Sequence, residues 1–84
     1  MRWSHLREHY PNQWVLFEAL EASSQNGKRI VESLAFVDTF ENSKTALEYY
    51  DKLHQKEPSR ELYVAHTSKE MLDLYERKWL GVRI

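Results

Sequence analysis

Two histidines and a glutamate near the N-terminus have the spacing of a metal-binding motif. The residues His5-Leu6-Arg7-Glu8-His9 match the pattern H-x-x-E-H, in which two histidines bind zinc and the glutamate acts as general base. On a helix, His5 and His9 lie one turn apart and can share a metal ion. Such enzymes need a third ligand from another helix, and Pro11 ends this helix directly after the motif. We therefore favour a solvated N-terminal helix face, with His5 and His9 as the metal candidates.

The segment His66-Thr67-Ser68 is the second place where side chains could do chemistry. A histidine beside a serine can take the hydroxyl proton and make the serine a nucleophile. The sequence supplies no defined acidic partner for such a pair and no G-x-S-x-G motif. Alternatively, Thr67 or Ser68 caps a following helix, with Glu70 completing a capping box. We favour the cap, and we keep His66 as a candidate binding residue.

Glu18 and Asp38 interrupt apolar runs on two segments that are expected to be adjacent strands. If burial separated their pKa values, the two carboxyl groups could act as acid and base. An interrupting carboxylate more often pairs with a basic side chain, and Arg29 and Arg60 are available for this. We favour the structural pairing over catalysis.

The C-terminal residues Trp79-Leu80-Gly81-Val82-Arg83-Ile84 are the strongest sign of an interaction surface. Trp and Arg are both over-represented among the residues that dominate binding energy at interfaces. The same apolar residues could instead fold back and complete the core of a small domain. The candidate interface residues are Arg60, His66, Trp79 and Arg83.

Composition limits the function classes. The 84 residues carry 12 basic and 13 acidic side chains, and this balance disfavours nucleic-acid binding, which calls for a basic face. The lysines that would have formed such a face are Lys44, Lys52, Lys56 and Lys69. The absence of cysteine excludes disulfides and thiolate chemistry. We expect neither a signal peptide nor a membrane span, and the expected location is the cytoplasm.

The first half of the chain predicts a short helix over 3–9, capped by Ser4, and then a β-hairpin. Residues 14–21 form the first strand and residues 29–40 the return strand, because β-branched and aromatic residues dominate them. Asn26-Gly27 between them is the strongest short hairpin signal, since both residues accept positive φ. Apolar residues occupy both faces of the first strand, so we expect both sheet faces to be at least partly covered.

The second half predicts a helix that starts at Asn42 or Ser43 and ends before Pro58. Residues 60–67 form the third strand, and a right-handed crossover would make it parallel to the second strand in the same sheet. A further helix is expected over 69–80, with a short strand through Leu72 and Leu74 as the alternative. The fold class is thus a single small α+β domain over residues 1–84, with ββαβ order, a three-stranded sheet, one main helix and short terminal helices.

Four blocks of the sequence resemble a family of small uncharacterised bacterial proteins. The blocks cover nearly the whole chain: Tyr10-Pro11-Asn12-Gln13-Trp14-Val15-Leu16, Glu57-Pro58-Ser59-Arg60-Glu61-Leu62-Tyr63, His66-Thr67-Ser68 and Glu76-Arg77-Lys78-Trp79-Leu80-Gly81-Val82-Arg83. The resemblance implies a bacterial cytoplasmic protein and suggests partners of the toxin–antitoxin or aspartic-protease-like type. It assigns no activity and no site residue.

The function predicted from these observations is a non-catalytic module for protein–protein interaction, of an accessory, regulatory, immunity or antitoxin kind. Its partner would be another protein or a second copy of the chain, and no cofactor, nucleic acid or membrane is expected. The alternative is a small hydrolase or metal-dependent enzyme that uses His66 or the cluster His5/Glu8/His9.

Overall fold

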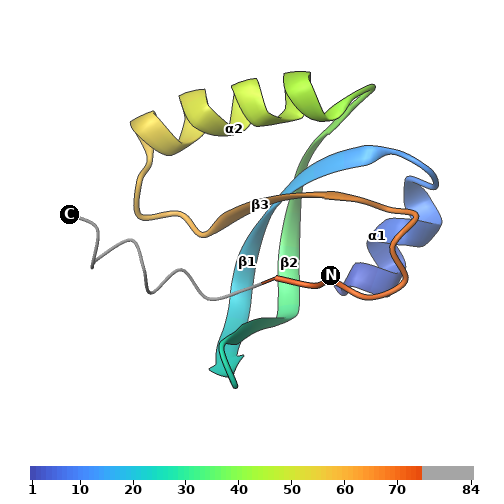
Figure 1. Cartoon of the computed structure of the whole chain (residues 1–84), viewed down its shortest axis with the longest axis vertical. Coiled ribbons are helices and arrows are strands. Elements are labelled where there is room, and N and C mark those ends of the chain that lie inside the picture. Colours follow the sequence, from blue (N-terminus) through green and yellow to red (C-terminus); the bar gives the residue numbers. More distant parts are fainter. Residues whose placement is uncertain (75–84) are drawn as a thin grey trace.

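The computed structural model describes residues 1–74, which form two helices and three strands (Figure 1). In chain order these elements are α1 (Trp3–His9), β1 (Trp14–Gln25), β2 (Lys28–Phe40), α2 (Ser43–Lys56) and β3 (Leu62–His66). The strands make one sheet in the order β2-β1-β3. The predicted α+β class and the ββαβ order are confirmed, with α1 preceding the first strand.

The hairpin of β1 and β2 is the longest feature of the fold, and its turn is the predicted one. Asn26 and Gly27 have φ of 51° and 79°, the pair of positive values that a type I′ turn requires. Gln25 pairs with Lys28 beside the turn, and Trp14 pairs with Phe40 at the open end. Three irregularities in the register bend the hairpin along its length.

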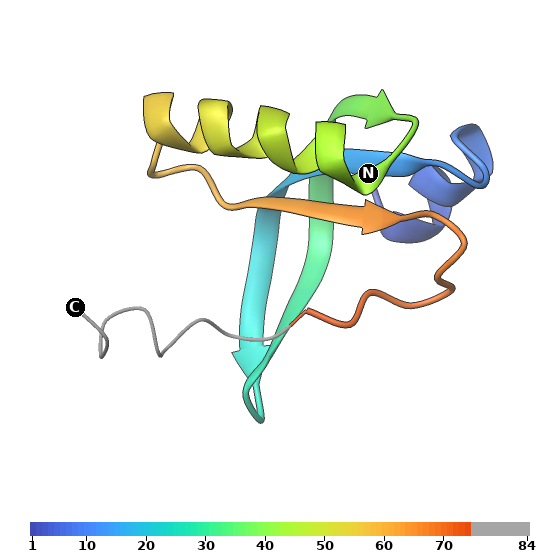
Figure 2. The same ribbon diagram turned by 45° about the horizontal axis from the view of Figure 1, so that its top comes forward.

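The third strand pairs with β1 and not with β2. Both β2 and β3 run antiparallel to β1, so β3 has the same direction as β2, as the crossover through α2 predicts. Because β1 lies between them, β3 is an edge strand of the sheet. It is visible in Figure 2 as the short strand beneath α2.

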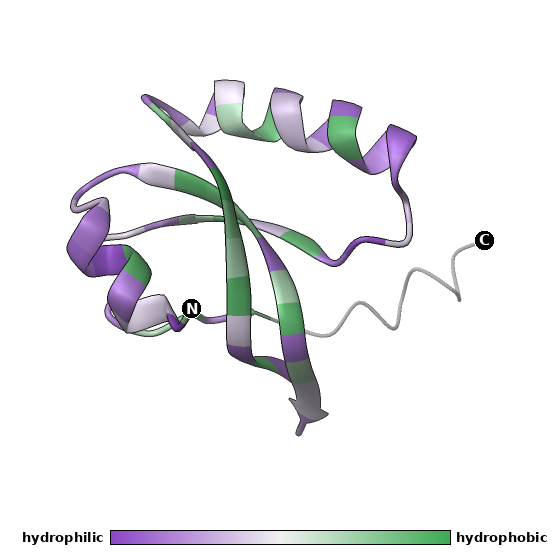
Figure 3. Ribbon diagram, turned by 180° about the vertical axis from the view of Figure 1, so that it is seen from behind, coloured by the Kyte–Doolittle hydropathy of each residue, from purple (hydrophilic) through white to green (hydrophobic). Residues whose placement is uncertain are grey.

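Each face of the sheet is covered by a different part of the chain, which confirms that apolar residues on both faces of β1 are used. On one face Val15, Phe17 and Leu34 form a cluster with Trp3 and Leu6 of α1. On the other face Leu16 is fully buried, and α2 packs there across all three strands with Ala46 buried. Figure 3 shows the apolar residues along β1 and β2 that supply these two cores.

The helix α1 has the predicted bounds but not the predicted cap. Its N-cap is Arg2, and no side chain caps the first turn, so the assignment of Ser4 is wrong. Tertiary contacts hold the helix instead. The indole Nε1 of Trp3 donates to the carbonyl of Lys69 at 3.0 Å, and Nε of Arg7 donates to the carbonyl of Thr67 at 2.8 Å.

The helix α2 starts and ends where its local signals indicate. The side chain of Asn42 accepts a hydrogen bond from the Thr45 amide at 2.9 Å, which satisfies one unpaired donor of the first turn. The helix ends at Lys56, just before Pro58. The predicted N-terminal cap and stop signal are therefore both confirmed.

The helix predicted over 69–80 is wrong where the structure describes it. Residues 69–74 contain neither helix nor strand, so the alternative strand through Leu72 and Leu74 is also wrong. These two side chains pack against the apolar cluster on the α1 face. The segment lies over this face of the sheet without forming a helix, because the seven residues of α1 do not cover the face alone. The remaining residues of the predicted helix, and the tail with Trp79 and Arg83, lie outside the described residues.

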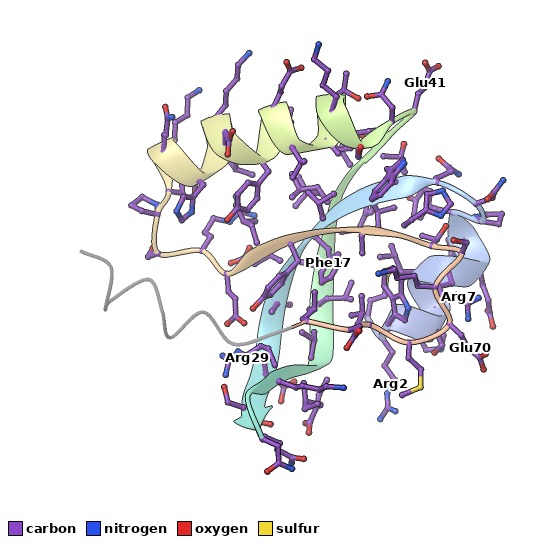
Figure 4. All side chains as sticks on the ribbon, viewed as in Figure 1. Arg2, Arg7, Phe17, Arg29, Glu41 and Glu70 are labelled. Atoms are coloured by element: carbon purple, nitrogen blue, oxygen red, sulfur yellow. The ribbon has the colours of Figure 1, made fainter. Side chains whose placement is uncertain are left out.

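The expected capping box does not form, because Thr67 has another role. Its side chain is buried, and its hydroxyl donates to the carbonyl of Tyr10 at 2.7 Å and accepts from the amide of Gln13 at 2.9 Å. Glu70 lies on the outer side of the segment that follows β3 (Figure 4). Thr67 thus holds the connection between α1 and β1 in place.

Candidate functional site

The free edge of β3 is the candidate functional site, and its backbone pattern can be read from the ends of the strand. The Ala19 amide donates to the carbonyl of Glu61 at 2.8 Å, and the Thr67 amide donates to the carbonyl of Gln13 at 2.9 Å. Backbone groups alternate in direction along an antiparallel strand. The odd-numbered residues of β3 therefore bond to β1, while the N–H and C=O groups of Leu62 and Val64 point away from the sheet.

Within residues 1–74, no backbone or side-chain group bonds to these outward groups of Leu62 and Val64. The opposite edge of the sheet, on β2, is treated differently. The Leu34 amide donates to the carbonyl of Met1 at 2.8 Å, and the Met1 ammonium donates to the carbonyl of Leu34 at 3.2 Å. Further along β2, the Arg29 amide donates to the carbonyl of Leu74 at 2.9 Å. The two ends of the described chain thus bond to the β2 edge at Arg29 and Leu34, whereas no described segment bonds to the outer edge of β3.

The composition of β3 adds to this difference. Its five residues are Leu-Tyr-Val-Ala-His, without the lysine, proline or bulge that proteins commonly use to protect an exposed edge strand from pairing. Leu62 is itself buried, with 4% exposed, so the accessible unpaired donor and acceptor of this strand are those of Val64. Nothing in the sequence of β3 repels an approaching strand.

The helix α2 flanks this open edge. Ala46, Tyr50 and Leu53 lie on its sheet-facing side, where they are less exposed than their neighbours. On one flank Tyr49 contacts Phe40 of β2, with 5.6 Å between ring centroids. Leu47 follows Ala46 by about 100° around the helix axis, so it lies on the flank opposite Tyr49, away from β2. The helix α2 itself runs beside β3 (Figure 1). The side chain of Leu47 is 50% exposed.

Arg60, a predicted interface residue, is held by carboxylates of its own chain. Its guanidinium lies 2.8 Å from Oε1 of Glu18 and 3.2 Å from Oε2 of Glu57. The hydrogen bond that Arg60 donates to Glu18 raises the pKa of the Arg60 side chain. The predicted structural pairing of Glu18 with an arginine is therefore confirmed. Asp38 instead accepts a hydrogen bond from the amide of its neighbour Thr39. Glu18 and Asp38 therefore do not form a carboxylate pair.

A second ionic cluster ties the hairpin to the start of β3. Arg29 donates from Nε and a terminal nitrogen to both carboxylate oxygens of Glu61, at 2.7 and 2.9 Å. The hydroxyl of Tyr63 donates to the same carboxylate at 2.6 Å. The arginine lowers the pKa of Glu61, while burial and the hydrogen bond to Glu61 raise the pKa of Tyr63 to about 12. Arg29 lies beside the lower part of the hairpin (Figure 4).

His66 lies at the end of the sheet in a row of rings. Phe40, Trp14 and His66 are directly opposite one another on β2, β1 and β3, and the ring of Trp14 meets that of His66 edge to face at 5.1 Å. Beside them an open cleft of about 340 Å³ is lined by Asn12, Gln13, Thr39, Phe40, Glu41 and His66. The sequence did not reveal this row, because it depends on the pairing register.

The contact between His66 and Ser68 does form, with 2.7 Å between Nδ1 and Oγ. The Ser68 amide also donates to Nδ1 at 3.2 Å, and because an amide N–H only donates, the neutral ring carries its proton on Nε2. In residues 1–74 no hydrogen bond joins His66 to a carboxylate, as a catalytic triad would require. The arrangement orders the turn after β3.

The histidine pair of α1 does not form a metal centre with other described residues. The two histidines bond within the helix, where Nδ1 of His9 donates to the backbone carbonyl of His5 at 2.8 Å. Among residues 1–74, no group of three or more potential ligands is placed to hold a metal ion. The helix ends at His9, so the H-x-x-E-H match lies on a single exposed turn.

Comparisons with protein-family models, with curated proteins and with solved structures find no match to this chain. In the part that the structure describes, no helix has the length and apolar character that crossing a bilayer requires.

Proposed function

We propose that this chain is a non-catalytic module for protein–protein interaction that binds another polypeptide by strand addition to β3. In this mode, main-chain hydrogen bonds supply affinity and alternate side chains supply specificity. The module would serve a bacterial cytoplasmic system in an accessory, regulatory, immunity or antitoxin role. The lack of cysteine supports a reducing compartment, and the resemblance in sequence supports a bacterial source.

The observation that carries the proposal is the unequal treatment of the two sheet edges. Three hydrogen bonds join Met1 and Leu74 to the β2 edge, at Leu34 and Arg29. Within the described residues, the outward backbone groups of Leu62 and Val64 on β3 have no partner. An unprotected edge strand is a template for pairing with another chain. Because the chain bonds to part of the β2 edge and leaves β3 unprotected, a binding role for β3 is favoured.

The test is a proline at position 64. Val64→Pro removes the outward N–H but no bond to β1, so the variant should fold, as proline is tolerated at an edge position. Used as bait in a bacterial lysate, the wild-type chain should retain a polypeptide, its own copy included, that Val64→Pro loses.

The matched control is Val64→Thr, which keeps both the β-branched shape and the amide proton. This variant should retain the same polypeptide as the wild type. If the proline variant is folded by circular dichroism and retains everything that the wild type retains, strand addition at β3 is ruled out.

The alternative function, a small hydrolase, is favoured by one observation, the 2.7 Å contact between His66 and Ser68. A fluorophosphonate probe, which labels activated serines, decides between the two. Labelling that disappears in Ser68→Ala would support a hydrolase, whereas the interaction module predicts no labelling in either protein.

A further inference from the structure

We infer that the strand added to β3 is β3 of a second copy, so that two chains form a twofold-symmetric dimer with a continuous six-stranded antiparallel sheet. This inference rests on the proposed function and names its partner. The twofold axis passes beside Val64.

The first argument is that the β3 edge is complementary to itself. The outward N–H and C=O groups of Val64 have no partner among residues 1–74, and a twofold rotation about Val64 places the N–H of each copy opposite the C=O of the other. In this register Leu62 of one copy faces His66 of the other. The strand carries no charged carboxylate, lysine or arginine between Leu62 and His66, so no like charges oppose each other along it.

The second argument comes from α2 and selects a second copy over an isolated peptide. Leu47 lies on the flank of α2 away from β2 and is 50% exposed. A lone peptide strand would satisfy the backbone of β3 but leave this flank in water. A second copy would bring its own α2 to the same face of the sheet, antiparallel to the first helix and beside it. The reason is that the twofold axis between two antiparallel edge strands is perpendicular to the sheet and keeps each face on the same side.

The resulting interface has the composition of a homodimer contact, with an apolar centre on the helix flank and paired backbone below it. Asp51 follows Leu47 by one turn and lies further toward the solvent side of α2. This placement leaves the carboxylates of the two copies at the rim. The ionic clusters of Arg60 and Arg29 are already complete within each chain and need no change on association.

The experiment measures the oligomeric state of the full chain over a range of concentrations by sedimentation velocity. The wild type should show a monomer–dimer equilibrium. Val64→Pro and Leu47→Lys should each weaken the dimer at least about tenfold. The control is Leu20→Lys, which changes a more exposed apolar residue (58%) in the part of β1 beyond its pairing with β3, and its dimer should match that of the wild type.

A cross-link tests the register. The chain has no cysteine, so Val64→Cys introduces a single thiol. Directly opposed residues in a hydrogen-bonded antiparallel pair have Cα atoms about 5.5 Å apart, which is within reach of a disulfide. Mild oxidation should convert Val64→Cys to a covalent dimer and leave Leu20→Cys largely monomeric.

The possible results separate this inference from the proposed function. A wild-type monomer that retains a different protein in a Val64-dependent manner overturns the dimer and leaves the interaction module standing. A monomer without Val64-dependent capture overturns both. A monomer whose Val64 amide resists hydrogen exchange would mean that a segment of the same chain covers the edge, and it also overturns both. A dimer unchanged by Val64→Pro and Leu47→Lys overturns the β3 interface.

Discussion

A single hydroxyl, that of Thr67, shows how much of this fold depends on contacts between residues distant in the sequence. The residue looked like a helix cap because Glu70 follows it at capping-box spacing. Its hydroxyl is instead buried between Tyr10 and Gln13, more than fifty positions away. No local pattern announces such a role, since the need for it arises only when β3 lies beside β1.

Replacing Thr67 by valine should be costly. The change preserves shape but leaves the Gln13 amide without the hydroxyl acceptor and the Tyr10 carbonyl without its donor. An unsatisfied buried polar group costs about 1–3 kcal/mol, so the free energy of unfolding in urea should fall by that order. Thr67→Ser keeps the hydroxyl and should lose less. Equal losses in the two variants would contradict the hydrogen-bonding role.

At the scale of elements, the sequence was sufficient wherever one short stretch carried its own signal. The Asn26-Gly27 turn, the Asn42 cap and the stop before Pro58 all act within a few residues, and all are present in the structure. The helix predicted over 69–80 is absent from its described part, residues 69–74, because the spacing of apolar residues is also compatible with an irregular segment. The position of Leu72 and Leu74 is decided by the uncovered face of the sheet, which is not encoded locally.

The hairpin turn supports a prediction about Gly27. Its φ of +79° belongs to the region that L-residues avoid, yet no atom would lie within 4 Å of an added Cβ. The cost of Gly27→Ala is therefore backbone strain alone, of about 1–2 kcal/mol, measurable as a lower midpoint in urea. Asn26→Gly, which relaxes the neighbouring positive φ, should be close to neutral. A Gly27→Ala variant as stable as the wild type would refute the type I′ assignment.

The link between β3 and the hairpin should appear in the pH dependence of stability. The pKa of Tyr63 is raised in the folded chain to about 12, from an ordinary value of 10.0. The folded state therefore holds this proton more tightly, and its contribution is present below pH 10 and is lost as the pH rises toward 12. Urea unfolding of the wild type should lose stability over this interval, and Tyr63→Phe should show a shallower decline. Parallel curves for the two proteins would remove Tyr63 as the source.

On the acid side the sign is opposite. The pKa of Glu61 is lowered by Arg29 from its ordinary value of 4.5, so its contribution is present above that value and is lost as the pH falls below it. The cluster of Arg29, Glu61 and Tyr63 thus stabilises the folded state at neutral pH, and its contribution decreases toward both acid and alkaline pH.

At the scale of the whole molecule, the candidate site could not be located from the sequence. The order β2-β1-β3 makes β3 an edge, and the occupation of the other edge by Met1 and Leu74 follows only from the three-dimensional arrangement. The sequence did identify Arg60 and His66 near this edge. It named them as interface candidates, which stays a prediction, and the structure shows that both also have partners within the chain. The sequence did not single out Val64 or Leu47.

The proposed dimerisation through β3 would make thermal stability depend on protein concentration. A partner that binds only the folded state raises the melting temperature by mass action. The Tm of the wild type should therefore rise across a concentration series, and the Tm of Val64→Pro should stay constant. A wild-type Tm that does not change with concentration would argue against association in the folded state.

The central position of β1 also has a consequence for biosynthesis. The strand that covers one side of β1 is β2, its immediate successor, but the strand on the other side is β3, which is translated last among the three. At roughly 5–20 residues per second, the interval between adding Phe40 and adding His66 is on the order of one to five seconds. During that time a nascent chain can close its hairpin while β1 still has an open side. We therefore expect the emerging polypeptide to be most vulnerable to misassociation on the ribosome shortly before β3 appears.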